Sequence, residues 1–267
     1  FMRANLAKRA LKAGKPSVGT WLSLGSITAS RFMARAGFQW LTVDIEHSLV
    51  DWETAAHMFA SIADAGCVPL ARVPSGRHDH IKRVLDNGAY GVVVPMVNTV
   101  QEAIDAVAAC KYPPVGNRSV GGSVHALNFG TSGPDYYDHA DEEILVVLQC
   151  EHIMAVENAD KIFSVPGIDA IFVGPNDLAA SMRSKDGKPP SAQATKEALD
   201  HILKTCKKHG VAPGIHCWSA DEVNTRASDG WQFMAINSEL KFMLNGAAAE
   251  VSKLKAGGAA TGEMAKY

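Results

Sequence analysis

Short apolar segments alternate with longer amphipathic stretches from one end of the chain to the other. The short segments are rich in Val, Ile and Leu, and most lack the alternation of polar and apolar positions that marks a half-exposed sheet. Segments of this kind are typical of strands covered on both faces in a parallel α/β sheet. The pattern predicts eight strands, at residues 18–22, 40–44, 68–73, 91–95, 144–149, 169–173, 211–215 and 231–236.

The amphipathic stretches between these strands predict helices. Several of them are followed directly by a glycine, the residue that most often ends a helix. The predicted helices cover residues 28–36, 51–65, 79–87, 99–110, 154–164, 192–209, 221–229 and 240–255.

Eight strand–helix units in about 250 residues is the count of a (βα)8 TIM barrel, an α/β fold. We therefore expect a single barrel domain over residues 1–256 and a frayed tail over residues 257–267. A doubly wound open sheet is the alternative, but it usually has fewer strands, and no GxGxxG or GxxxxGKS/T phosphate loop follows a predicted strand. Residues 111–143 interrupt the pattern, and their length predicts a functional lid. Residues 181–190 predict a second polar loop.

Composition narrows the class of protein. The 267 residues are 47% hydrophobic and 20% charged, with a net charge of -2, which excludes a disordered chain and gives no basic excess for nucleic acid or an anionic membrane. The longest apolar runs are far shorter than the ~20 residues of a membrane span. Five scattered cysteines without a CxxC motif fit a reducing cytoplasm. The basic N-terminal segment has no apolar core and predicts an amphipathic helix, not a signal peptide.

Polar and charged residues stand directly after several predicted strands. The C-terminal ends of the strands form the mouth of a TIM barrel, where its chemistry takes place, so these residues are expected to converge. They are Asp44, Glu46 and His47 after the second strand, Arg72 at the end of the third, Gln149, Glu151 and His152 after the fifth, Gly174, Pro175, Asn176 and Asp177 after the sixth, and His216 after the seventh.

Glu151 and Asp177 follow neighbouring strands and suit a hard divalent ion. Magnesium or manganese is commonly bound by one or two carboxylates, with water and substrate completing its coordination. The alternative is that each carboxylate caps the following helix or pairs with a nearby cation. Zinc is disfavoured because no His and Cys residues have ligand spacing, and His152 is expected to begin a helix.

His47 is a candidate general base, since its pKa lies near neutrality and Asp44 or another carboxylate could orient it; otherwise it is a hydrogen-bonded loop histidine. Arg72 could stabilise negative charge on an oxygen, or form a salt bridge across the mouth. His216 and Cys217 have no partner in the sequence and are expected to be structural. No lysine lies within or at the C-terminal end of a predicted strand, where a Schiff-base aldolase would place it, so carbonyl chemistry is expected to need a metal.

Nine short sequence motifs, in their order and spacing along the chain, make it similar to the HpcH/HpaI family of metal-dependent, class II pyruvate aldolases. The similarity covers nearly the whole chain, residues 18–254. The motifs are Gly19-Thr20-Trp21, Asp44-Ile45-Glu46-His47-Ser48, Ala71-Arg72-Val73-Pro74, Leu85-Asp86-Asn87-Gly88-Ala89, Pro95-Met96-Val97, Pro113-Pro114-Val115-Gly116-Asn117-Arg118, Gln149-Cys150-Glu151, Ala155-Val156-Glu157-Asn158 and Phe172-Val173-Gly174-Pro175-Asn176-Asp177-Leu178.

The resemblance implies a barrel whose last helix is exchanged between subunits, usually in a trimer-based hexamer. It also implies which residues bind ligands. Glu151 and Asp177 would hold a divalent ion (Mg²⁺, Mn²⁺ or Co²⁺), and Gln149 with the chain at Gly174, Pro175, Asn176 and Asp177 would bind pyruvate.

The resemblance assigns the catalytic roles as well. His47 would be the acid/base residue, Arg72 would stabilise the enolate, and Asp86 would raise the basicity of the histidine. The position of Asp86 at the end of a predicted helix, on the opposite face of a plain barrel, indicates by itself only helix-end hydrogen bonding.

The implied reaction is the cleavage or formation of a 4-hydroxy-2-oxo acid, with pyruvate and an aldehyde as the other partners. Three departures from the family pattern, at Ser119, His152 and Met182-Arg183, lie near the loops that would choose the aldehyde and leave it open. The alternatives are macrophomate-synthase-like decarboxylation with C–C bond formation, a CoA-thioester lyase of the citrate-lyase β type, and a non-catalytic binding barrel.

Overall fold

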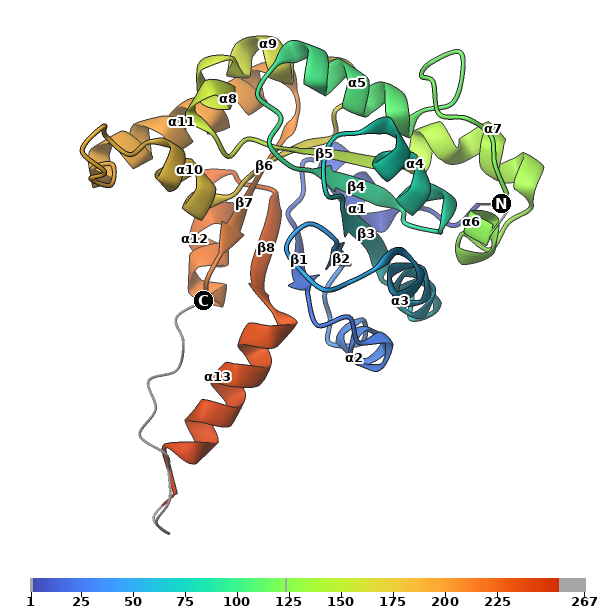
Figure 1. Cartoon of the computed structure of the whole chain (residues 1–267), viewed down its shortest axis with the longest axis horizontal. Helices are drawn as coiled ribbons and strands as arrows, with labels where there is room; N and C mark the ends of the chain where they lie inside the picture. Colours follow the sequence, from blue (N-terminus) through green and yellow to red (C-terminus); the bar gives the residue numbers. More distant parts are fainter. Residues whose placement is uncertain (1, 123, 255–267) are drawn as a thin grey trace.

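The computed structural model describes residues 2–122 and 124–254 and contains a closed barrel of eight parallel strands (Figure 1). The strands pair in sequence order, and β8 closes the barrel against β1. The predicted TIM barrel is therefore confirmed, and the alternative of an open sheet is wrong. The strands are β1 Ser17–Leu22, β2 Trp40–Asp44, β3 Val68–Arg72, β4 Gly91–Val94, β5 Leu145–Gln149, β6 Ala170–Val173, β7 Ala212–Cys217 and β8 Phe233–Ser238.

Helices cover the outside of the barrel, and several begin at polar capping residues. The side chains of Asp51 and Ser191 cap two of them, and Thr99 forms a reciprocal capping box with Glu102. The helices are α1 Leu6–Lys12, α2 Ile27–Met33, α3 Trp52–Asp64, α4 His78–Asp86, α5 Val100–Cys110, α6 Val124–Asn128, α7 Gly133–Glu143, α8 Ile153–Glu157, α9 Ala159–Phe163, α10 Pro175–Ser181, α11 Ala192–His209, α12 Ala220–Asp229 and α13 Glu239–Val251.

Residues 111–143 are not the open lid that their length predicts. They contain α6 and α7, and the side chain of Arg118 is completely buried among them. The end of α7 leads into the first residue of β5 and binds the N-terminal segment, since Glu143 accepts the Asn5 N–H at 2.6 Å. This segment thus packs at the end of the barrel opposite the mouth (Figure 1). Its described residues do not line the cavity at the mouth of the same chain, so the prediction of a lid there is wrong.

Large side chains fill the barrel interior, so it is a packed core and not a channel. The rings of Trp40 and Phe233 stack with their centroids 4.3 Å apart, and Phe172 meets Phe233 edge-on at 5.9 Å. A methyl group at Gly19 would lie 2.1 Å from the Trp40 ring, so only glycine fits beside it. The filled interior confines open space to the strand ends.

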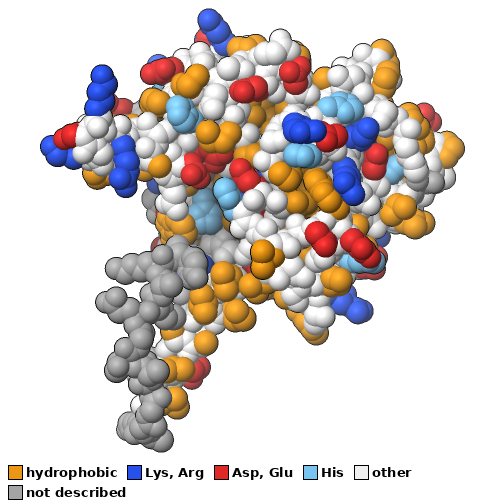
Figure 2. All heavy atoms as spheres, viewed as in Figure 1, with side chains coloured by type: hydrophobic (Ala, Val, Ile, Leu, Met, Phe, Trp, Pro, Cys, Tyr) orange, Lys and Arg blue, Asp and Glu red, His pale blue; other side chains and the backbone are white. Residues whose placement is uncertain are grey.

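The last helix stands apart from the barrel. Helix α13 projects away from the strands (Figure 1), and Glu239 is its one buried residue among those described. Figure 2 shows hydrophobic side chains along it, and Met243, Val251 and Leu254 are exposed. The predicted tail, residues 257–267, lies outside the described residues. Within the described residues, no helix is long and apolar enough to cross a membrane.

Candidate active site

A cavity of about 300 Å³ opens at the C-terminal ends of the strands. Most of the residues predicted for the site line it, and they come from loops far apart in the sequence. The lining residues are Trp21, Ser23, Asp44, His47, Arg72, Gln149, Glu151, Phe172, Gly174, Pro175, Asn176, Asp177, His216, Trp218, Asn237, Ser238, Leu240 and Lys241. The structure therefore brings together the predicted metal, pyruvate and acid/base residues, with Asp86 as the exception.

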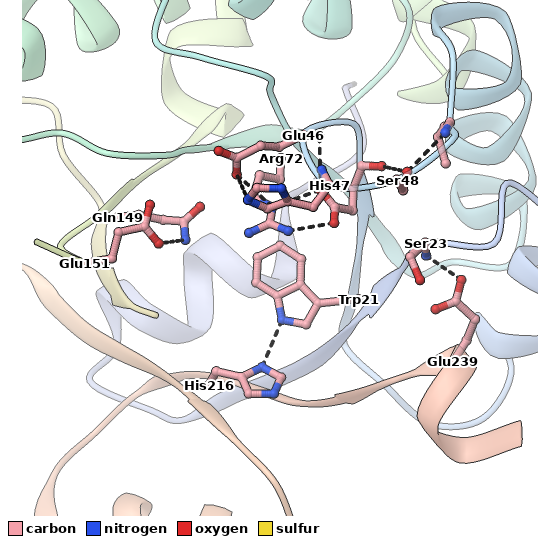
Figure 3. A network of polar contacts seen from close by, with 12 residues as sticks. Trp21, Ser23, Glu46, His47, Ser48, Arg72, Gln149, Glu151, His216 and Glu239 are labelled. Atoms are coloured by element: carbon pink, nitrogen blue, oxygen red, sulfur yellow. Dashed lines mark hydrogen bonds and ion pairs between the residues drawn. The ribbon is translucent and has the colours of Figure 1, made fainter. Parts of the chain in front are cut away.

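Arg72 is held in one orientation by a paired carboxylate. Asp44 and Arg72 are register partners at the ends of β2 and β3, and their side chains form two hydrogen bonds, Nε to Oδ1 at 2.9 Å and Nη2 to Oδ2 at 2.6 Å. The guanidinium also stacks over Trp21, with Cζ 4.7 Å from the ring centroid (Figure 3). Bidentate pairing and stacking fix the plane of the cation, as a preorganised charge partner requires.

The carboxylate beside His47 is Glu46, not Asp44. Asp44 Oδ1 accepts the backbone N–H groups of Glu46 and His47 at 3.1 and 3.2 Å, so it shapes the turn. Glu46 Oε2 lies 3.7 Å from His47 Nε2 and 3.4 Å from Arg72 Nε. Burial raises the pKa of Glu46. Glu46 was not singled out in the sequence because neighbouring turn residues give no sign of which one faces the imidazole.

Glu151 and Asp177 approach each other across Gly174. A methyl group on Gly174 would lie 2.7 Å from Glu151 Oε2, which would have to shift, and 3.7 Å from Asp177 Oδ2, an ordinary contact distance. Glu151 is buried and accepts the Met96 N–H at 2.9 Å and the Gln149 amide at 2.6 Å. Burial raises the pKa of Glu151 to about 7, and the negative charge of Asp177 adds to the effect.

These residues fit a divalent cation with hard oxygen ligands. A cation would relieve the repulsion that raises the pKa of Glu151, and the buried Gln149 Oε1 has no hydrogen-bond partner among the described residues. Within residues 2–122 and 124–254, no group of three or more His, Cys, Asp or Glu could hold a metal. Two carboxylates alone suit Mg²⁺ or Mn²⁺ better than Zn²⁺. His152 begins α8, as expected, where its Nδ1 accepts the Met154 N–H.

The wall formed by β1, β7, β8 and the start of α13 holds two further lining residues, His216 and Lys241. His216 was expected to be structural but lines the cavity, and its Nδ1 accepts the Trp21 indole N–H at 3.1 Å (Figure 3). Burial lowers the pKa of His216 to about 4. None of the eight described strands contains a lysine, but Lys241, in the first turn of α13, lines the cavity.

Asp86 lies outside the cavity. It is the last residue of α4, and its Oδ1 accepts a hydrogen bond from Arg118 Nη2 at 2.7 Å. It is not among the described residues that line the cavity. The structure of one chain thus supports the helix-end reading of Asp86, and its action on His47 stays a prediction.

Comparisons with known proteins identify the family of the chain. A family model described as HpcH/HpaI aldolase/citrate lyase matches residues 17–246. The chain is 36% identical over 237 residues to a 5-keto-4-deoxy-D-glucarate aldolase of Enterobacter sp. (strain 638), covering 88% of this chain and 91% of the relative.

Solved structures give the same result. An HpcH/HpaI aldolase/citrate lyase family protein from Burkholderia cenocepacia J2315 superposes with a TM-score of 0.87 at 31% identity, covering 95% of this chain and all of that one (100%). An HpcH/HpaI aldolase from Desulfitobacterium hafniense DCB-2 superposes with a TM-score of 0.84 at 28% identity, covering 97% and 99%. The matches confirm the prediction of an aldolase, a carbon–carbon lyase. The chain belongs to the HpcH/HpaI aldolase/citrate lyase family.

Proposed function

We propose that this protein is a divalent-metal-dependent aldolase that cleaves or forms 4-hydroxy-2-oxo acids, with pyruvate and an aldehyde as the other partners. The observation that carries the proposal is the approach of Glu151 and Asp177 across Gly174, in one cavity with Gln149 and the oriented Arg72. The name of the Enterobacter relative, an aldolase of a keto-deoxy sugar acid, supports this substrate class.

Glu151 and Asp177 would hold Mg²⁺, Mn²⁺ or Co²⁺ in this proposal. The ion would polarise the 2-oxo group and stabilise negative charge on its oxygen. Gln149 and the chain from Gly174 to Asp177 would bind the pyruvate part of the substrate. The amide of Gln149 already donates to Glu151, so its free Oε1 is the atom left for a ligand.

Arg72 and His47 would divide the remaining chemistry. In cleavage, His47 removes the proton of the 4-hydroxyl, the C3–C4 bond breaks to give the aldehyde, and its electron pair passes to the pyruvate enolate. Arg72, fixed by Asp44, donates N–H groups to the oxygen on which this charge develops. Protonation of the enolate carbon then gives pyruvate. Glu46 faces the His47 imidazole and would orient the ring for proton transfer.

A pyruvate-release assay tests the proposal directly. The purified enzyme should release pyruvate from a panel of 4-hydroxy-2-oxo acids, lose this activity with a chelator and regain it with Mg²⁺, Mn²⁺ or Co²⁺. Full activity after exhaustive metal removal would exclude the metal role. Oxaloacetate decarboxylation coupled to C–C bond formation, cleavage of a CoA thioester, or binding without turnover would instead support one of the three alternatives.

We also propose that the protein is a homo-oligomer in which α13 is exchanged between subunits, as in a trimer-based hexamer. The eighth helix of a TIM barrel would cover β8 and β1, but α13 leaves that surface, and a hollow beside it is lined by Val18, Phe38, Val223 and Ile236. The exposed apolar residues of α13 match such a hollow in a partner. A 28.4 kDa monomer by light scattering at micromolar concentration would contradict this.

We place the enzyme in the cytoplasm within the same proposal. All five cysteines are free and buried in the structure. Recovery of the native protein in a periplasmic or extracellular fraction would contradict this placement.

A further inference from the structure

Lys241 brings a positive charge to the cavity wall. It lies in the first turn of α13, where its backbone N–H donates to the Ser238 side chain that caps the helix, and the residue is part of the cavity lining. Among the described residues, no carboxylate lies within ion-pair distance of its ammonium group, whereas Arg72, the other cation in the lining, is paired with Asp44.

The surroundings of Lys241 in the cavity contain no compensating negative charge. The carboxylates that line the cavity are Asp44, Glu151 and Asp177, which belong to β2, to the loop after β5 and to α10. No described lining residue from β1, β7, β8 or α13 is acidic. Glu239, although close to Lys241 in sequence, is turned to the backbone N–H groups of Ser23 and Leu24 at 2.5 and 2.7 Å.

His216 adds a neutral hydrogen-bond donor to the same wall. Because the Trp21 indole donates to His216 Nδ1, the proton of the neutral imidazole is on Nε2. Trp218 packs edge-on against this ring, with centroids 4.4 Å apart, and limits its rotation. The wall thus presents one cation and one fixed N–H group to whatever fills the cavity.

The division of the cavity determines which part of a substrate meets this wall. In the proposed function, the pyruvate part lies at Glu151 and Asp177, beside β5 and β6, and the reacting hydroxyl faces His47 on the β2 side. The remaining wall, formed by β7, β8 and β1, is left for the far end of the aldehyde. We propose that Lys241 selects aldehydes that carry an anionic end group, a carboxylate or a phosphate, an inference that rests on the proposed function.

Substitution of Lys241 measures this selection. In the synthesis direction, pyruvate is combined with succinic semialdehyde, glyceraldehyde 3-phosphate or uncharged glyceraldehyde, and kcat/KM is measured for each. Lys241→Met should lower kcat/KM for an anionic aldehyde, relative to glyceraldehyde, by about 10- to 100-fold, the usual size of a lost charged hydrogen bond. The two anionic aldehydes show whether carboxylate or phosphate is preferred. Lys241→Arg should restore most of the ratio.

Two controls make the outcome decisive. Lys196→Met removes a positive charge from α11, outside the cavity, and should leave the ratio unchanged. Metal-dependent exchange of pyruvate methyl protons tests the proposed function alone, because no aldehyde takes part. If wild-type enzyme shows no such exchange, the proposed function fails. If exchange occurs but Lys241→Met leaves the ratio unchanged, the role of Lys241 is wrong. A borohydride-trapped pyruvate adduct on Lys241 would also overturn it.

Discussion

The two ends of the barrel differ in how their charged side chains are paired. At the N-terminal end, Lys8 is a buried residue of α1, and its Nζ lies 2.9 Å from Asp169 Oδ2 and donates to the Ile144 carbonyl at 2.6 Å. Glu143 is likewise shared between the Asn5 backbone N–H and the Arg9 guanidinium. At the C-terminal end, Glu151 and Asp177 approach each other and form no ion pair with a described cation, and Lys241 has no acidic partner among the described residues.

The difference shows what each end is for. Paired and hydrogen-bonded charges close the bottom of the barrel and contribute to the folded state only if both partners remain. At the mouth, Arg72 is paired with Asp44 and Glu46, but Glu151, Asp177 and Lys241 form no ion pair among the described residues. Unpaired charges cost stability but give strong interactions with a ligand of complementary charge. Variants at the mouth should therefore change chemistry, and variants at the bottom should change stability.

The largest effect is expected at His47. Loss of a general base costs ~10²–10⁴ in rate, so His47→Ala should lower aldol cleavage by this amount. Exchange of pyruvate methyl protons should fall less, since pyruvate has no 4-hydroxyl. Arg72→Ala should lower both reactions, by ~10²–10³, because the enolate oxygen forms in each. Cleavage rates and deuterium exchange measured on both variants separate the roles.

Bound metal is the control for these two variants. Neither residue is a proposed ligand, so metal content should equal that of the wild type. If His47→Ala loses the metal, His47 is a ligand and another residue must be the base. If Arg72→Ala exchanges pyruvate protons at the wild-type rate, its assigned role is wrong.

At the bottom of the barrel, Lys8→Met should reduce stability and spare activity. It leaves Asp169 without its cation in a buried site, and breaking a buried ion pair in this way costs about 3–5 kcal/mol. Urea unfolding should show this loss in the free energy of unfolding, with kcat per folded enzyme unchanged. The double variant Lys8→Met with Asp169→Asn is the control and should recover part of the stability. A large loss of kcat in folded Lys8→Met would break the distinction between the two ends.

The sequence predicted the barrel well because its strands are continuous apolar runs, whose ends are visible without a structure. Positions at strand ends also located Arg72, Glu151 and Asp177. The predictions were wrong or incomplete where the end of a helix or strand differed from the pattern, and where the direction of a side chain decides whether it belongs to the site. The predicted helix 154–164 is divided into α8 and α9 at Asn158, whose side chain donates to the Asn98 carbonyl.

Orientation explains the missed site residues. Glu46 and His47 are adjacent, and only the turn held by Asp44 shows that the Glu46 carboxylate approaches both the imidazole and Arg72. His216 gains its partner from Trp21, which is 195 positions away in the chain. No local pattern contains such a contact, because strand closure between β8 and β1 creates it.

A third experiment uses the raised pKa of Glu151. Because the pKa of this carboxyl group is about 7 in the metal-free fold, its contribution to folding stability is greatest below its ordinary pKa of 4.5. That contribution is lost as the pH rises through 7. A bound cation requires the ionised form, so apparent metal affinity should fall about tenfold per pH unit below 7. Thermal unfolding with and without Mn²⁺ should show a Tm gain that grows from pH 5.5 to pH 8. Glu151→Gln should show little gain at any pH, and an equal gain at all pH values in the wild type would contradict the assignment.

The smallest effect is expected at His216, which lines the cavity at the mouth but should not change its protonation state in the pH range of the assays. Burial lowers its pKa to about 4, so the imidazole is neutral throughout the range from pH 5.5 to pH 9. His216→Gln should therefore change kcat/KM by only a few-fold, through the hydrogen bond to Trp21, and leave the shape of the pH–rate profile unchanged. His47→Gln is the matched comparison and should lower kcat/KM by ~10²–10⁴, as expected for the loss of a general base. If His216→Gln causes the larger loss instead, the base of the mouth lies on β7 and not after β2.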